Sequence, residues 1–347
     1  MAEIRWETVP CPLCHAQAAT TVLELSTSPW GRPLTLRQCR ECTLGYLSPR
    51  PVRADLGLLY AQDYEAYQPT PVKPLNWRRR LAERFERWVS QARLNSPPRR
   101  DGLWPRLATW PLRLWFTPPP DALMAIPYTG QGRLLDCGCG AGWYLARMQA
   151  RGWDVMGLDF SPHAVQAARE HYGLDVHVGS LPHPLVGPAS FDVVTLGQVL
   201  EHVPDPHELI AAAVTALRPG GRLALSVPNL ASWGRAAFGP YWWPLQLPLH
   251  LLHFTPTAMQ RLLADHGLGV RELRMMRMTN WMQRSWQLGE ADRWRQQPPP
   301  LPRWLGRRRL TAKLLTHWTR LQGQADGMRV LAEKPAQAPP LPAHRAA

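Results

Sequence analysis

Four of the six cysteines form two Cys-x-x-Cys pairs, Cys11 with Cys14 and Cys39 with Cys42, separated by 24 residues. Each pair makes a tight turn that points two thiolates at one ion, and four thiolates complete the tetrahedral shell that zinc prefers. Because no ligand position stays open, we expect a structural zinc ion that holds together a module too small for its own core. His15 could replace one ligand, although we expect it to be a solvated neighbour.

A second cluster with chemical potential is a glycine loop, in which Gly138, Gly140 and Gly142 follow the apolar run that ends at Asp136. Glycines between a strand and a helix let the backbone approach a ligand at the helix N-terminus. A dinucleotide loop has the spacing Gly-x-Gly-x-x-Gly, and here the third glycine comes one residue early. Asp136 would repel a pyrophosphate and attract a cation. S-adenosylmethionine (SAM), with a sulfonium, an ammonium and no phosphate, suits this loop better than a nicotinamide dinucleotide.

Further cofactor contacts are expected at the ends of the next two strands. Asp159 closes the second strand and can accept hydrogen bonds from both ribose hydroxyls, as in dinucleotide folds. Phe160 offers a flat face for the adenine ring, and Ser180 and Leu181 would flank the other edge of that ring. The alternative role for Asp159 is the N-cap of the next helix, which Ser161 fills better.

The elements that must position these residues alternate between strands and helices. Strands are expected at 133–137, 153–158, 175–178, 191–196 and 222–227, with helices from the glycine loop to about 151 and at 162–172, 207–217 and 256–266. Such alternation predicts a parallel, doubly wound sheet. A further strand is expected near 270–278, and 329–334 is expected to be the last, edge strand of the sheet.

Five motifs in this order resemble a class I SAM-dependent methyltransferase over about 118–336. They are Asp136–Gly142, Asp159–Pro162, Ser190–Val194, Val199–Val203 and Leu217–Gly221. The resemblance implies an α/β fold with a doubly wound, mostly parallel, seven-stranded Rossmann-like sheet. It also implies that Asp136 and the loop glycines hold the methionine part of SAM, that Asp159 holds the ribose, and that Gln198 lines the methyl-transfer site. Cys139 stands at a loop position where small residues vary, and Ser180 replaces an acid that often contacts the adenine amine.

The N-terminal part resembles the zinc-binding leader of many bacterial methyltransferases, with two Cys pairs followed by Gly45–Pro51 and Tyr60–Tyr64. Enzymes of this type, by resemblance, methylate sugars, quinone precursors and cell-surface polymers. We therefore expect methyl transfer to an oxygen, nitrogen or carbon nucleophile of a small-molecule, sugar or lipid-linked acceptor. A degenerate, zinc-stapled scaffold without activity is the alternative, which the intact glycine loop and Asp159 disfavour.

Three histidines, His202, His250 and His253, are candidates for the base that a hydroxyl or acidic carbon nucleophile requires. All three follow predicted strands, on the side of a parallel sheet where ligands bind. His202 could instead brace its loop, and a metal pair at His250 and His253 lacks an evident third ligand. The aromatic run at 238–244 is either a lid over the acceptor or a packing loop.

The chain has 347 residues and a formal net charge of +14, distributed unevenly. Residues 1–120 carry 17 basic and 10 acidic side chains, 121–270 carry 8 and 11, and 271–347 carry 15 and 5. We expect a zinc-binding module at 1–66, a basic Trp/Arg-rich helical linker or cap at 67–117, and the methyltransferase domain at 118–336. The domain would include a helical insertion at 281–326, and a disordered tail would follow at 337–347.

The two basic, tryptophan-rich segments allow three interpretations. A helical cap over the active site is favoured, followed by contact with an anionic membrane surface, chiefly through the basic helix expected at 77–92. Nucleic acid is the least favoured partner, because the arginines cluster with Pro-Trp motifs rather than on a recognition helix. The N-terminus lacks the apolar run of a signal peptide, and no transmembrane segment is evident. We expect a cytoplasmic protein, with peripheral contact at the inner membrane face as an option.

Overall fold

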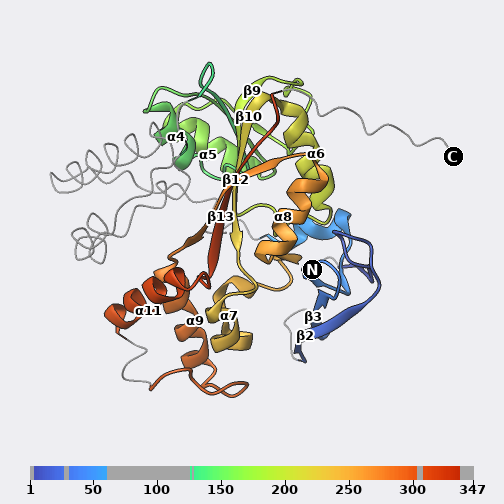
Figure 1. Ribbon diagram of the computed structural model, residues 1–347, viewed down its shortest axis with the longest axis vertical. Coiled ribbons are helices and arrows are strands. Elements are labelled where there is room, and N and C mark those ends of the chain that lie inside the picture. The colour runs from blue at the N-terminus through green and yellow to red at the C-terminus, as the bar shows by residue number, and fades with distance from the viewer. Residues whose placement is uncertain (1–3, 27–30, 61–125, 127–128, 303–307, 337–347) are drawn as a thin grey trace.

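The computed structural model describes residues 4–26, 31–60, 126, 129–302 and 308–336, and its centre is a seven-stranded sheet (Figure 1). The strands lie in the order β12-β13-β10-β9-β6-β7-β8. Their bounds are β6 Arg133–Cys137, β7 Asp154–Asp159, β8 Val176–Val178, β9 Phe191–Gly197, β10 Leu217–Pro228, β12 Gly269–Met276 and β13 Gly327–Glu333. The strands β8, β7, β6, β9 and β10 are mutually parallel, which confirms the doubly wound, mostly parallel sheet.

The prediction of an edge strand at 329–334 is wrong. β13 is an interior strand that pairs antiparallel with β10 on one side and with β12 on the other. Six of its seven residues are buried, including Met328, Val330 and Ala332. Burial on both faces is typical of an interior strand, and the apolar residues Val330–Ala332 were a better guide than position in the chain. β12 takes the edge.

Helices cover both faces of the sheet, with α4 and α5 on one side and α6 and α8 on the other (Figure 1). Their bounds are α4 Trp143–Gln149, α5 Pro162–Tyr172, α6 Pro206–Ala216 and α8 Pro256–Asp265. Each of the last three begins with proline after a side chain that caps it. Ser161 accepts a hydrogen bond from Ala164 N, as predicted, and Asp205 and Thr255 do the same for α6 and α8. Among the described helices, none combines the length and apolar character needed to cross a bilayer.

The N-terminal module consists of short strands that share a sheet with the large domain. Its bounds are β1 Trp6–Glu7, β2 Ala19–Leu25, β3 Leu34–Cys39, β4 Gly45–Leu47, β5 Arg50–Pro51 and the 3₁₀ helix η1 Arg53–Leu59. β2 and β3 form an antiparallel hairpin between the two Cys pairs. The sheet order β11-β4-β3-β2 includes β11 Leu252–His253 from the large domain. The module and the large domain therefore share a sheet and the main apolar core.

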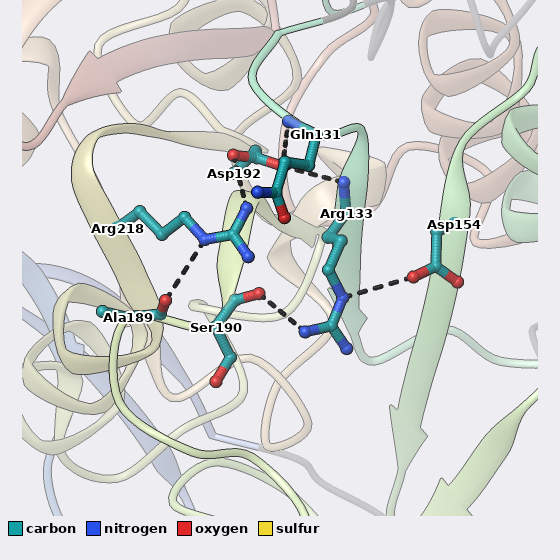
Figure 2. Close-up of polar contacts among 7 residues, drawn as sticks. All are labelled: Gln131, Arg133, Asp154, Ala189, Ser190, Asp192 and Arg218. Atoms are coloured by element: carbon teal, nitrogen blue, oxygen red, sulfur yellow. Dashed lines mark hydrogen bonds and ion pairs between the residues drawn. The ribbon is translucent and has the colours of Figure 1, made fainter.

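Asp192 ties together the strand ends opposite the glycine loop (Figure 2). Its buried carboxylate accepts hydrogen bonds from Gln131 N at 3.0 Å, Arg133 N at 2.9 Å and Arg218 Nη1 at 3.0 Å. Arg133 Nη1 also donates to Ser190 O at 3.1 Å. The motif residue Asp192 therefore fixes the register of β6, β9 and β10 at the end of the sheet away from the site.

A helical cap lies beyond β12 and β13 (Figure 1). It consists of α7 Trp233–Phe238, the 3₁₀ helices η4 Gly239–Tyr241 and η5 Trp243–Leu245, α9 Thr279–Ala291 and α11 Arg309–Leu321. Phe238, Tyr241 and Trp242 are buried in a cluster with Trp286 and Trp294, so the run at 238–244 is packing rather than a lid. The described part of the segment 281–326 contains most of α9 and all of α11, with turns at 292–302. The segment 67–117, with its expected helix, and the tail 337–347 lie outside the described residues.

Candidate active site and metal centre

A cavity of about 190 Å³ opens at the carboxyl ends of the parallel strands. Its walls come from the glycine loop, the start of α4 and the ends of β9, β10 and β12, and are formed by Asp136, Gly138, Cys139, Trp143, Tyr144, Gly197, Gln198, Ser226, Met276 and Met278. Four predicted cofactor residues are among them: Asp136, Gly138, Cys139 and Gln198. This is the position at which parallel α/β sheets bind ligands.

The loop requires glycine at two positions at least. Gly138 has a φ of +80°, and an added Cβ would lie 2.3 Å from Val199 Cγ2. Gly142 has a φ of +82° at the N-cap of α4, where an added Cβ would lie 2.7 Å from Leu174 Cδ1. Both conformations are costly for residues with a side chain. Gly140 also has a positive φ, and its backbone N–H is committed to Asp159.

Asp136 is the principal charge in the cavity wall. Its side chain is buried and accepts a hydrogen bond from Thr195 Oγ1 at 2.5 Å. The pKa of this carboxyl is raised to about 7, chiefly by burial and also by the nearby Asp159, against the lowering effect of the Thr195 hydrogen bond. A buried carboxylate without a cation is unfavourable, and a positively charged ligand would offset the cost of its burial. The wall is therefore suited to a cationic ligand and unsuited to a pyrophosphate.

Asp159 organises the loop. Its Oδ2 accepts from Gly140 N at 2.8 Å and its Oδ1 accepts from Ser161 N at 2.9 Å. Burial raises the pKa of Asp159, whereas these two backbone donors lower it. Each carboxylate oxygen retains a second lone pair, so the predicted ribose contact stays compatible with this arrangement.

The residues predicted around the adenine ring lie outside the cavity wall. Phe160 is 48% exposed and is contacted edge-on by Tyr60 of the N-terminal module, with ring centroids 4.9 Å apart. Ser180 is exposed and its Oγ lies 3.7 Å from Cys137 Sγ, whereas Leu181 is buried in the main core. The roles of Phe160, Ser180 and Leu181 at adenine stay predictions. The role of Gly142 at the methionine part of SAM also stays a prediction.

Gln198 is held in a conformation that few non-glycine residues adopt, with a φ of +58°. Its backbone N–H donates to Ser226 O at 2.9 Å, and its Nε2 donates to Ser226 Oγ at 3.1 Å. Backbone strain at the end of β9, supported by β10, is typical of a functional position. This geometry is consistent with the predicted place of Gln198 beside the transferred methyl group.

Sequence reasoning missed six wall residues: Trp143, Tyr144, Gly197, Ser226, Met276 and Met278. Trp143 and Tyr144 directly follow the last loop glycine, so their position was a usable signal. Met276 and Met278 come from the end of β12, whose place beside the cavity depends on the unpredicted insertion of β13 between β10 and β12.

The three candidate bases form a separate buried cluster that does not line the cavity. His202 and His250 have ring centroids 4.6 Å apart, and His253 lies 6.1 Å from His250. His250 Nδ1 lies 2.7 Å from Pro244 O. Because a carbonyl only accepts, Nδ1 carries the proton and Nε2 keeps a lone pair. Burial lowers the pKa of His202 to about 4 and of His253 to about 3, and that of His250 falls well below its usual range.

Glu201 joins this cluster and was not predicted, although it directly precedes His202 in the sequence. It is 1% exposed, and neither of its carboxyl oxygens has a hydrogen-bond partner among the described residues. Burial raises the pKa of Glu201 to about 8. Ligand atoms of Glu201, His202 and His250 lie within 4.8 Å of one another, close enough to hold a metal ion. The group that could hold a metal ion therefore consists of His250, His202 and Glu201, whereas the sequence had suggested a pair of His250 and His253.

The four N-terminal cysteines converge on one point. Cys11 Sγ lies 3.4 Å from Cys42 Sγ, Cys14 Sγ lies 3.4 Å from Cys39 Sγ, and all four sulfurs are within 4.8 Å of one another. Tetrahedral zinc with Zn–S bonds of about 2.3 Å requires sulfur separations of roughly 3.8 Å. All four thiols are free of disulfides. The cluster therefore fits a structural zinc ion, with no protein ligand position left for catalysis.

Comparison with known proteins gives the same class. A family model described as a methyltransferase domain matches residues 77–273. A ubiquinone biosynthesis O-methyltransferase of Xanthomonas euvesicatoria is 33% identical over 165 residues, covering 44% of this chain and 69% of the relative. One from Idiomarina loihiensis is 38% identical over 109 residues, covering 29% and 45%. A solved SAM-dependent methyltransferase from Mesorhizobium loti has a TM-score of 0.42 and 19% identity, covering 65% of this chain and 97% of that one.

The chain belongs to the methyltransferase domain family, and it is a class I SAM-dependent methyltransferase. SAM is its methyl donor. When bound, SAM supplies an electrophilic methyl group on a sulfonium. The chain's residues supply the acidic wall at Asp136, the close backbone approach at Gly138 and the loop anchor at Asp159.

Proposed function

We propose that this enzyme transfers the methyl group of SAM to a hydroxyl oxygen of a small-molecule acceptor. Methyl transfer from a sulfonium is an in-line displacement, so the protein chiefly aligns nucleophile, methyl and sulfur. A hydroxyl nucleophile must also lose its proton, which an amine that is already neutral need not do. The observation that carries the proposal is the unprotonated Nε2 of His250 beside the unpartnered carboxyl of Glu201.

The assignment of roles follows from this arrangement. Because the cluster does not line the cavity, the proposal requires the acceptor hydroxyl to reach from the cavity to His250. There His250 Nε2 accepts the hydroxyl proton, and the carboxyl of Glu201 stabilises the imidazolium that forms, while His202 orients the pair. Burial lowers the pKa of His250 well below its usual range, so the ring needs a nearby anion to act as a base. Glu201, with a pKa of about 8, supplies that anion once it is ionised, so we expect turnover to rise with pH through about 8. The names of the relatives, O-methyltransferases of ubiquinone biosynthesis, support an oxygen acceptor.

The test compares acceptor classes and then variants. Purified, zinc-loaded protein is incubated with SAM and matched phenols, catechols and aromatic amines, and the products are identified by mass spectrometry. We expect methylated hydroxyl compounds. His250→Gln should lower turnover at least ~100-fold while leaving the affinity for S-adenosylhomocysteine (SAH) unchanged. The exposed His163→Gln is the matched control. Methylation of amines only, or full turnover by His250→Gln, would refute the proposal.

A further inference from the structure

Helix α11 buries a mainly small and polar face and exposes large apolar side chains to solvent. Its buried residues are small or polar: Ala312, Thr316, His317 and Thr319. Four large apolar residues face outward, with Leu310 66% exposed, Leu314 50%, Trp318 45% and Leu321 64%, whereas Leu315 is partly buried against the aromatic cluster. Trp318 also meets Trp233 edge-on, with ring centroids 6.3 Å apart. In water-soluble domains the apolar stripe of a surface helix normally faces the core.

The inward face packs against α9 and the aromatic cluster. Thr316 Oγ1 lies 3.1 Å from Thr279 Oγ1 on α9, and Ala312 and Leu315 pack against the cluster of Phe238 and Trp286. A rotation of the helix that buried the leucines would break the contact with α9. The outward apolar stripe at 310, 314, 318 and 321, spaced i, i+4, i+8 and i+11, is therefore a fixed property of the packed helix.

Charge decides which occupant suits this stripe. α11 carries Arg309, Lys313 and Arg320 and no acidic residue, and Arg308 directly precedes it. Packing against a second copy of the same helix would place these cations close to the same cations of the other copy, which is electrostatically unfavourable. The segment expected to be helical at 77–92 is also strongly basic, with Arg78, Arg79 and Arg80. An anionic lipid surface satisfies both features at once, because it offers an apolar layer for leucine and tryptophan beneath a negatively charged one for arginine and lysine.

We propose that α11 is a membrane-docking helix, which inserts Leu310, Leu314, Trp318 and Leu321 into the interface of an anionic bilayer. α11 packs against α9, and α9 follows directly on the end of β12, whose Met276 lines the cavity. Docking would thus hold the cap and the cavity beside the lipid surface. The inference is independent of the acceptor proposed above, because the binding assay requires no methyl transfer.

The experiment is co-sedimentation of the full-length, zinc-loaded protein with vesicles of equal parts phosphatidylcholine and phosphatidylglycerol, across a salt series. The comparison vesicles contain phosphatidylcholine only. We expect binding to the anionic vesicles at low salt and release as salt rises. The triple variant Leu310→Gln/Leu314→Gln/Leu321→Gln should lose at least ~100-fold in partition coefficient. The control Leu58→Gln/Leu185→Gln, at residues 51% and 59% exposed elsewhere, should bind as the parent does.

A second variant keeps the test independent of folding. Arg309→Gln/Lys313→Gln should weaken binding to anionic vesicles by about fivefold per cation, and SAH affinity monitors the fold of every variant. Three outcomes would overturn the proposal: no binding by the parent protein, undiminished binding by the triple variant, or a parent dimer that the triple variant converts to monomer. The second outcome would assign membrane contact to another segment, and the third would assign the stripe to a second copy.

Discussion

Replacing Asp136 by asparagine should stabilise the ligand-free protein and weaken its hold on SAM. Burial raises the pKa of Asp136 from its ordinary 3.8 to about 7, so the folded state binds this proton more tightly than the unfolded state. Ionisation therefore costs stability as the pH rises from about 4 to about 7, and the whole cost is present above pH 7. Asparagine keeps an oxygen that can accept from Thr195 but carries no charge.

The magnitude follows from the shift. About three pKa units at about 1.4 kcal/mol each give roughly 4 kcal/mol at pH 8 and under about 2 kcal/mol at pH 5. The amide nitrogen of asparagine would lack a hydrogen-bond partner, which lowers the gain in stability by about 1 kcal/mol. We expect Asp136→Asn to raise the free energy of unfolding by about 3 kcal/mol at pH 8, and by roughly 1 kcal/mol or less at pH 5.

The assay is chemical denaturation at both pH values, without ligand and with saturating SAM, together with calorimetric titration of SAM. Loss of the carboxylate that faces the cation should weaken SAM binding at least tenfold at pH 8. Parent SAM affinity should itself fall as the pH is lowered through about 7, because the proton and the cation compete for Asp136. A variant that is less stable than the parent at pH 8, or that binds SAM equally well, would refute the reasoning.

Three further perturbations separate the parts of the molecule. Asp192→Ala should lower the free energy of unfolding by about 3 kcal/mol with SAH affinity retained, since its bonds lie at the far end of the sheet (Figure 2); urea titration with and without SAH checks both. Gly138→Ala, at a φ of +80° and against Val199, should weaken SAH binding at least ~10-fold by calorimetry. Cys42→Ser should release the zinc, measured by elemental analysis, and lower the melting temperature by several degrees; a full zinc equivalent retained by Cys42→Ser would contradict the four-cysteine site.

The cofactor side of this enzyme was predictable because its parts are local in sequence. Asp136, Gly138 and Cys139 lie within four residues of one another in one strand-loop unit, and the strand that ends at Asp159 lies beside that unit in the sheet. Local spacing fixed the cysteine cluster as well, since each pair makes its own turn. The choice of SAM over a dinucleotide rested on the glycine spacing, the acids Asp136 and Asp159 at the strand ends and the family motifs, all of which can be read from the sequence.

The rest depended on pairings between distant segments. β13 enters between β10 and β12, and this placement alone brings Met276 to the cavity. The inverted orientation of α11 depends equally on what α9 presents to it. Helical periodicity in the sequence marks an apolar stripe on such a helix but does not show whether the stripe faces the core. Glu201 was overlooked for a related reason, because an acid beside a candidate base is recognised only when both are known to be buried.

The N-terminal module takes part in the site through geometry rather than chemistry. β4 of the module pairs with β11, which contains His253, and an added Cβ at Gly45 would lie 3.0 Å from His253 Cβ. Tyr60 OH lies 3.0 Å from His202 Nδ1 on another face of the same cluster. The zinc site orders the strands that flank the histidine cluster, whereas the glycine loop makes no strand pairing with the module. Loss of zinc should therefore impair acceptor turnover more than SAM affinity, which separates the two halves of the reaction by their structural support.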